Sequence, residues 1–343
     1  MTRAVFACLA LALLAASCSS GPKELVLMTH SSFVISEAAI EAFETANNID
    51  LVVRPSGDGG SMVNQAVLTK DNPVADVLFG IDNTFLSRAL DEELFVAYES
   101  PLLSTVPAEL VLDPEHRVTP IDFGDVCLNF DRSAFIEAGA TVPATLAELT
   151  DPTYRGRLVV EDPATSSPGL AFLLATIAEF GETGDYTWED YWRDLVANDV
   201  LAVSSWEEAY YSEFSGASDG TRPLVVSYAS SPPAEVIFGD EDVVQAPTGV
   251  IPATCFRQVE FAGILAGTDL ETESRALIDF LLSVEFQEEV PLSMFVFPAN
   301  QEAALPQEFI DHTTVPANPA TIAPDAIAAN RERWIETWTE IVR

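Results

Sequence analysis

The feature that most constrains the fold is an alternation of apolar strand-like runs with helical stretches along the 343 residues. The first set of predicted strands comprises 25–29, 50–53 and 76–80. A helix follows each of them: one capped by Ser36, with Ala39, Ile40 and Phe43 on one face, one after the turn at 57–60, and one from Asn83 onward. This order implies parallel strands whose sheet faces are covered by helices.

A second set of the same kind follows. Its predicted strands are 157–160, 201–203 and 224–227, and its predicted helices are 168–180, 188–196 and one after Ser205. Two long extended segments, 123–130 and 253–261, connect the two sets. Two α/β units with two crossovers predict a hinged ligand clamp that buries its ligand between two lobes. We assign 25–121 plus 260–300 to lobe 1, 122–259 to lobe 2, and 301–343 to a C-terminal helical segment that packs on the lobes.

The N-terminus indicates export. Arg3 precedes the apolar run 4–16, which is typical of a signal peptide over 1–17 and falls short of the ~20 residues that span a bilayer. The small residues before Cys18 resemble a bacterial lipobox, so we expect Cys18 to be acylated and residues 18–24 to form a tether. The protein would then lie in the periplasm or on the outer face of the cell membrane. The alternative is ordinary secretion with an incidental cysteine.

Cys127 and Cys255 are the two cysteines left after the signal peptide and the lipid site. In an oxidising compartment they form either one disulfide or two buried thiols, and the sequence leaves both open. The charge is strongly acidic, with 54 Asp and Glu against 16 Lys and Arg. Such a field excludes nucleic acid as a partner and favours cationic ligands, although a general adaptation for solubility explains it more simply.

Catalytic and metal-binding motifs are absent from the sequence. The three histidines, His30, His116 and His312, are scattered, and there is no HExxH, G-x-S-x-G, Walker A or G-x-G-x-x-G motif. We therefore expect a protein that is not an enzyme and that has no catalytic residues, no metal site and no cofactor.

The binding candidates follow predicted strands. Ser166, Ser167 and Gly169 stand at a helix N-terminus, where hydroxyls and free N–H groups suit an anion or polar ligand, or only cap the helix. Trp206, with Glu207 and Glu208 beside it, suits a cation, or is a core residue. Four further candidates share this placement at strand ends, where α/β proteins bind ligands: Tyr228, His30, Asp58 and Asp82. Each alone is more often a turn or cap residue.

Several segments together resemble the thiamine-binding periplasmic protein family, within the ABC substrate-binding proteins for iron, polyamines and thiamine. They are 75–83, 120–124, 161–170, 205–210, 224–232, 297–300 and the C-terminal stretch with Trp334 and Trp338. The resemblance implies a two-lobed, periplasmic-binding-protein-like (type II) α/β fold, with a mostly parallel mixed sheet flanked by helices in each lobe and a two-strand hinge. It also implies a monomer that captures thiamine or its phosphates and delivers them to ABC permease and ATPase subunits.

The resemblance also assigns residues. Ser166, Ser167 and Gly169 fall in the polar or phosphate-facing loop, Trp206 and Tyr228 on aromatic contact positions, and Asp58 on an acidic one. Three positions differ from the family: His30 and Ala234 replace tyrosines, and Phe295 replaces a tryptophan. A related aromatic cation is therefore a further candidate ligand.

Three alternatives stay open. A polyamine would suit aromatic walls with carboxylates, and ferric iron would need tyrosines such as Tyr210 and Tyr211 with acidic or histidine ligands. A secreted hydrolase or adhesin is a third alternative, which the missing site motifs disfavour.

Overall fold

The computed structural model describes residues 21–239 and 245–343, so the predicted signal peptide and Cys18 lie outside the described residues. The strands are β1 (Lys23–Thr29), β2 (Ile49–Pro55), β3 (Val77–Asp82), β4 (Phe95–Val96), β5 (Thr119–Asp131), β6 (Leu158–Glu161), β7 (Leu201–Val203), β8 (Leu224–Tyr228), β9 (Thr248–Leu265) and β10 (Phe297–Pro298). The helices are α1 (Glu37–Asn47), α2 (Gly59–Leu68), α3 (Leu86–Asp91), α4 (Arg132–Glu137), α5 (Ser167–Phe180), α6 (Trp188–Ala197), α7 (Trp206–Glu208), α8 (Pro232–Ile237), α9 (Glu271–Leu281), α10 (Val284–Gln287), α11 (Val290–Ser293), α12 (Gln307–His312) and α13 (Pro324–Val342).

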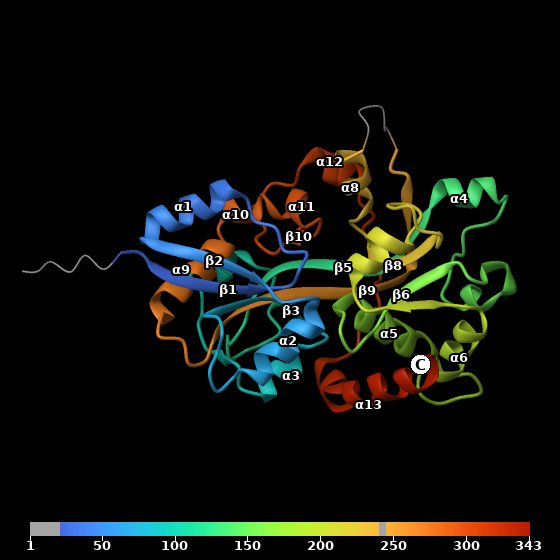
Figure 1. Cartoon of the computed structure of the whole chain (residues 1–343), viewed down its shortest axis with the longest axis horizontal. Coiled ribbons are helices and arrows are strands. Elements are labelled where there is room, and N and C mark those ends of the chain that lie inside the picture. The colour runs from blue at the N-terminus through green and yellow to red at the C-terminus, as the bar shows by residue number, and fades with distance from the viewer. Residues whose placement is uncertain (1–20, 240–244) are drawn as a thin grey trace, which may run out of the picture.

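The strands form one mixed sheet in the order β2-β1-β3-β9-β5-β8-β6-β7, with β4 added to β9 and β10 to β5. Strand β1 runs parallel to β2 and β3, and β6 runs parallel to β7 and β8. These are the two parallel groups that the sequence alternation predicts. The α/β class with a mixed sheet flanked by helices is confirmed (Figure 1).

Two long antiparallel strands connect the groups. Strands β5 and β9 pair from Thr119–Ala262 at one end to Asp131–Thr248 at the other. In Figure 1 they run through the middle of the molecule, with β1 and β2 on one side and β6 on the other. The predicted lobe boundaries, 121/122 and 259/260, fall inside these two strands, where Asp122 lies opposite Glu260. We refer below to the β1–β3 half and the β6–β8 half.

The helix predicted from Asn83 onward begins later, at Leu86. Asp82 accepts hydrogen bonds from the backbone N–H groups of Thr84 and Phe85, which hold a turn before the helix. Asn83 instead bonds the backbone of β9, accepting from the Val259 N–H at 2.8 Å. The N-cap predicted for α1 is confirmed, because Ser36 Oγ accepts from the Ala39 N–H.

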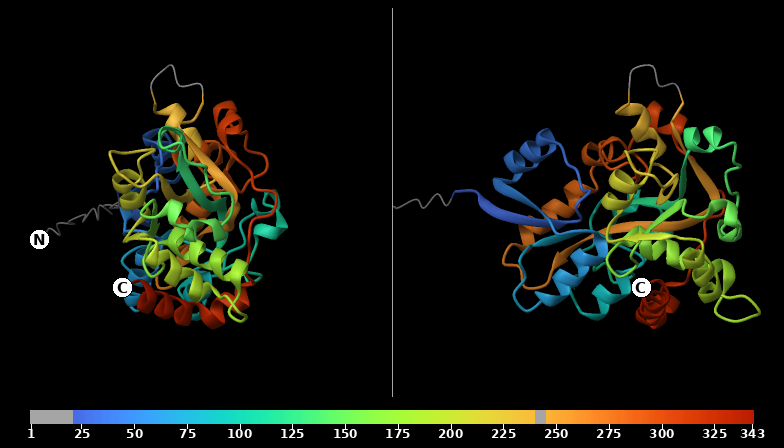
Figure 2. Two further views of the ribbon diagram at one scale, coloured as in Figure 1. Left: turned by 90° about the vertical axis from the view of Figure 1, so that its right-hand side faces the viewer. Right: turned by 45° about the vertical axis from the view of Figure 1, so that its right-hand side comes forward.

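The C-terminal helix α13 packs on helices of both halves, along the lower edge of the molecule in Figures 1 and 2. Trp338 meets the ring of Trp192 on α6 edge-on, with centroids 5.4 Å apart. The guanidinium of Arg331 lies 5.3 Å from the ring of Phe85, next to α3. Among the helices that the structure describes, none has the length and apolarity that a membrane crossing requires.

A disulfide joins Cys127 on β5 to Cys255 on β9, which is one of the two states that the sequence left open. Both residues are buried, in a small cluster with Ala229. The bond closes a loop of 128 residues that contains the whole β6–β8 half.

Candidate functional site

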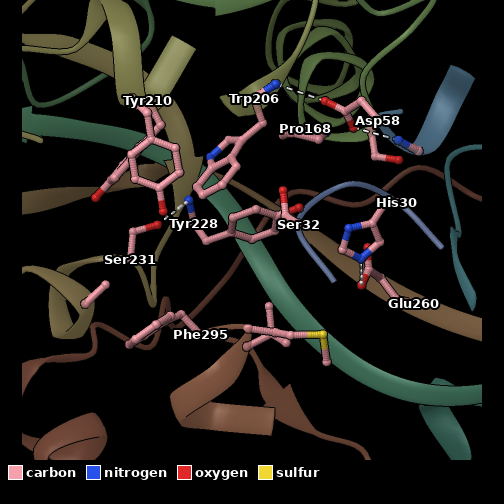
Figure 3. A pocket seen from close by; sticks show the side chains of 16 residues that line it. His30, Ser32, Asp58, Pro168, Trp206, Tyr210, Tyr228, Ser231, Glu260 and Phe295 are labelled. Atoms are coloured by element: carbon pink, nitrogen blue, oxygen red, sulfur yellow. Dashed lines mark hydrogen bonds and ion pairs between the residues drawn. The ribbon is translucent and has the colours of Figure 1, made fainter. Parts of the chain in front are cut away.

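A cavity with a volume of about 730 Å³, its open mouth included, is lined by residues of both halves. Six of the predicted site residues line it: His30, Asp58, Ser167, Trp206, Tyr228 and Phe295. They come from the loops after β1 and β2, from the first residues of α5 and α7, from the end of β8 and from the segment before β10. Figure 3 labels five of them, His30, Asp58, Trp206, Tyr228 and Phe295, around one space, with Trp206 and Tyr228 on one side and His30 on another.

Three predicted residues lie outside the cavity lining, and each has a structural task. Ser166 is the buried N-cap of α5 and accepts from the Gly169 N–H. Gly169 packs α5 against β6, since a Cβ there would lie 2.7 Å from the Glu161 carbonyl oxygen. Asp82 is fully buried and organises the turn before α3. Ala234, one of the three positions singled out by the resemblance, does line the cavity.

An aromatic wall forms one side of the cavity. Trp206 stacks on Tyr210 with centroids 5.1 Å apart, and meets Tyr211 and Tyr228 edge-on at 5.4 and 6.4 Å. The Trp206 Nε1–H donates to Ser227 Oγ at 2.9 Å, which fixes the indole plane. Burial and the nearby carboxylates raise the pKa of Tyr228 well above its usual value, so its hydroxyl stays protonated at neutral pH. Such a wall can stack on a flat ring or attract a cation.

Asp58 joins the two halves at the cavity. It caps α2, where Oδ1 accepts from the Gly59 N–H at 2.7 Å, and its Oδ2 accepts from the backbone N–H of Trp206 at 2.9 Å. Ser61 adds a second link, because its N–H donates to the Thr165 carbonyl. The α2 N-terminus therefore touches the loop before α5 and the start of α7, so the halves are in contact around the cavity.

Negative charge faces the aromatic wall. Glu260 lines the cavity from β9, and its Oε2 lies 3.7 Å from His30 Nε2, an ion-pair distance rather than a hydrogen bond. Burial lowers the pKa of His30, but Glu260, with Asp58 and Glu207, outweighs it and holds that pKa above its ordinary value. His30 is thus biased toward the charged form by the surrounding carboxylates.

The third side is apolar. Met294, Phe295 and Val296 line it, and the Phe295 ring meets Phe238 edge-on at 5.7 Å. The backbone of Phe295 is in the left-handed region, with a φ of 54°. This conformation is strained for a bulky residue, and strained residues of this kind cluster at ligand sites.

Several lining residues did not emerge as binding candidates from the sequence. The sequence made Tyr210 and Tyr211 candidates as iron ligands, and it predicted no binding role for Ser32, Ser231, Met294 and Glu260. Both tyrosines follow Trp206 closely in the sequence and lie in one irregular turn, Ala209–Glu213. Their position next to Trp206 could therefore have indicated that they line the same cavity. Glu260 lies inside a long strand, where nothing in the local sequence indicates a cavity.

The arrangement offers stacking surfaces, carboxylates and an apolar side, which together suit a flat organic cation. Within residues 21–239 and 245–343, no three His, Cys, Asp or Glu side chains are grouped as metal ligands would be.

Comparisons with known proteins add to this geometry. The family model described as bacterial extracellular solute-binding protein matches residues 72–316. The thiamine-binding periplasmic protein of Salmonella typhimurium is 29% identical over 97% of this chain and 98% of its own. A solved periplasmic thiamin binding protein superposes with a TM-score of 0.83 at 25% identity, covering 95% of this chain and 98% of that one. Iron-bound HitA from Pseudomonas aeruginosa, at 18% identity and a TM-score of 0.74 over 93% of this chain and 99% of its own, shares the fold.

Proposed function

Since the chain belongs to the family of bacterial extracellular solute-binding proteins, we propose that its cavity captures thiamine or a thiamine phosphate. The protein is a substrate-binding component of an ABC importer and not an enzyme. Its place is outside the cytoplasm, where it binds a small molecule for the membrane subunits of the transporter.

One observation carries the choice of ligand: a stacked aromatic wall faces a buried carboxylate across a single cavity. Thiamine has two flat rings, and its thiazolium ring carries a permanent positive charge. The aminopyrimidine would stack on Trp206 or Tyr228, and the thiazolium charge would lie toward Glu260. Ser167 also lines the cavity, and its hydroxyl would meet a polar end of the ligand.

A titration of intrinsic tryptophan fluorescence tests this function. Thiamine, its mono- and diphosphate, spermidine and ferric citrate are added separately to the purified mature protein. Quenching that saturates with thiamine or a thiamine phosphate at the lowest concentration is the expected result. Saturation by spermidine alone would identify the ligand as a polyamine, and a visible tyrosinate band with ferric citrate would identify it as iron.

The anchoring and the assembly state belong to the same proposal. We infer that Cys18 is acylated, that residues 18–24 tether the folded part to the membrane, and that the protein acts as a monomer with two lobes, 25–121 plus 260–300 and 122–259. Replacing Cys18 by serine should move the protein from the membrane fraction to the aqueous fraction, whereas an unchanged distribution contradicts acylation.

A further inference from the structure

Three acidic residues lie in a row across three adjacent strands. Glu260 on β9 is directly opposite Asp82 on β3 and directly opposite Asp122 on β5. Opposed residues of antiparallel strands project on the same face, with side chains about 4.5–5.5 Å apart. Asp82 and Asp122 are fully buried and Glu260 is 9% exposed, at the cavity wall.

Little in the described structure neutralises this row. Both carboxyl oxygens of Asp122 lack a hydrogen-bond partner among the described residues, and the ion pair of Glu260 is with His30 at 3.7 Å. The Gln258 amide donates to Asp82 at 3.2 Å and to Glu260 at 3.3 Å, but it brings no charge. Like charges opposed across strands destabilise a sheet, and burial increases the cost. Such a row is stable only with a proton or another cation among its oxygens.

Titratable groups surround the row on several elements. They are His30 after β1, Asp82 on β3, Asp122 on β5 and Tyr228 on β8, with Asp58 acting on His30 and Tyr228, Glu207 acting on His30, and Asp82 acting on Arg331 of α13. Burial and the charge of Glu260 raise the pKa of Asp122 well above its usual range. Burial raises the pKa of Asp82 to about 6. Asp122 therefore keeps its proton to a higher pH than an ordinary carboxyl group does, and it does so directly opposite Glu260.

We propose that Glu260 recognises the positive charge of the ligand and that Asp122 is its positioning partner, so that a cationic ligand entering the cavity displaces the proton that the two carboxyls share. This rests on the proposed function in one respect: the ligand is a cation. The displaced proton passes to the solvent. One positive charge leaves the row as another arrives, so the buried charge stays balanced.

Proton release makes the affinity depend on pH. While the free protein holds the proton, each bound cation releases up to one, and affinity rises up to about tenfold per pH unit. The dependence flattens above the pH at which the free pair loses its proton. An anionic or neutral ligand would not displace the proton and would not show this rise.

Calorimetry with thiamine measures the released proton directly. The binding enthalpy of the mature protein is measured at pH 7.5 in phosphate, HEPES and Tris, whose ionisation enthalpies differ. Asp82 is mostly ionised at that pH, since its pKa is about 6. A plot of binding enthalpy against buffer ionisation enthalpy should give a slope that corresponds to release of a substantial fraction of one proton.

Four variants locate the source, each first checked for a cooperative thermal transition. Asp122→Asn should bind thiamine with no proton release and a flat pH profile. Glu260→Gln should lose the release and bind at least tenfold more weakly. Glu161→Gln is the matched control, because Glu161 is also buried with both oxygens unpartnered but does not line the cavity, and it should keep the wild-type slope. His30→Gln should keep it as well.

The outcomes separate the two proposals. If thiamine does not bind the wild type, the proposed function fails. If thiamine binds with a slope of zero, the function stands and the carboxyl-pair inference is overturned. It is also overturned if Glu161→Gln or His30→Gln abolishes the release while Asp122→Asn retains it, since the proton then comes from another group.

Discussion

At the residue scale, Trp206 takes part in three interactions at the cavity. Its ring stacks on Tyr210, its Nε1–H is held by Ser227, and its backbone N–H bonds Asp58 of the opposite half. The backbone bond survives any substitution except proline, so a change of this side chain tests the wall rather than the contact between the halves.

Replacing Trp206 by alanine should weaken thiamine binding at least tenfold in calorimetry. Stacking contributes about 0.5–1.5 kcal/mol and cation–π attraction about 0.5–2 kcal/mol, and a loss of 1.4 kcal/mol is tenfold. Trp206→Phe, which keeps a ring but not the Nε1–H, should bind thiamine with an affinity between those of the wild type and Trp206→Ala. Tyr186→Ala, an exposed aromatic that does not line the cavity, serves as control. An unchanged thiamine affinity in Trp206→Ala would show that the Trp206 side chain does not contact the ligand.

Some site residues were predictable from the sequence and others were not. Asp58, Trp206 and Tyr228 follow or end predicted strands, and the α/β order brings such positions to one region. Ser166 also follows a predicted strand, but its side chain caps α5 and does not line the cavity, because some side chains at a helix N-terminus point into the protein. Glu260 and Asp122 become neighbours only through the register of β5 and β9, which the local sequence does not reveal.

At the scale of elements, the start of α2 sets how closely the two halves approach. Gly59 and Gly60 are buried, and the loop before α5 lies against them. A Cβ at Gly60 would lie 2.9 Å from the Thr165 carbonyl oxygen and 2.7 Å from the Phe85 ring. Only a residue without a side chain allows this contact.

Gly60→Ala should therefore lower thiamine affinity by about tenfold, because overpacking by one methyl group costs ~1–3 kcal/mol and part of this cost falls on the contact with Thr165 of the other half. Gln65→Ala, on the exposed face of the same helix, controls for the change in helix propensity. Fluorescence titration with thiamine measures both variants. Equal affinities for Gly60→Ala and the wild type would mean that the halves do not need this approach to hold the ligand.

The disulfide between β5 and β9 constrains the unfolded chain. Since it closes a 128-residue loop, the double variant Cys127→Ser/Cys255→Ser should lower the free energy of unfolding by about 2–5 kcal/mol. Urea denaturation of the oxidised wild type and the variant measures the difference, and thiol titration of the denatured wild type checks the bond. Two free thiols in the wild type, or equal stabilities, would contradict this account.

The elements themselves were largely predictable, because alternating apolar runs and helical spacing are local properties. The late start of α3 was not, since it depends on how Asp82 and Asn83 bond to the turn and to β9. The pairing of Cys127 with Cys255 needed the register of two strands that are far apart in the sequence.

At the scale of the whole molecule, function depends on two halves that share β5 and β9 and meet around one cavity. Two residues of the acidic row, Asp122 and Glu260, lie in these same strands at the predicted lobe boundary, so the groups proposed to meet the ligand charge are next to the connection between the halves. The overall acidity, a net charge of −38, adds a general attraction for cations that does not select among them. The residues that line the cavity must therefore distinguish one cation from another.

The crystal structure of the mature protein grown with thiamine tests the central claim most directly. The account predicts thiamine in the cavity, with one ring against Trp206 or Tyr228 and the thiazolium ring nearest Glu260. An empty cavity, or thiamine held elsewhere on the protein, would contradict it.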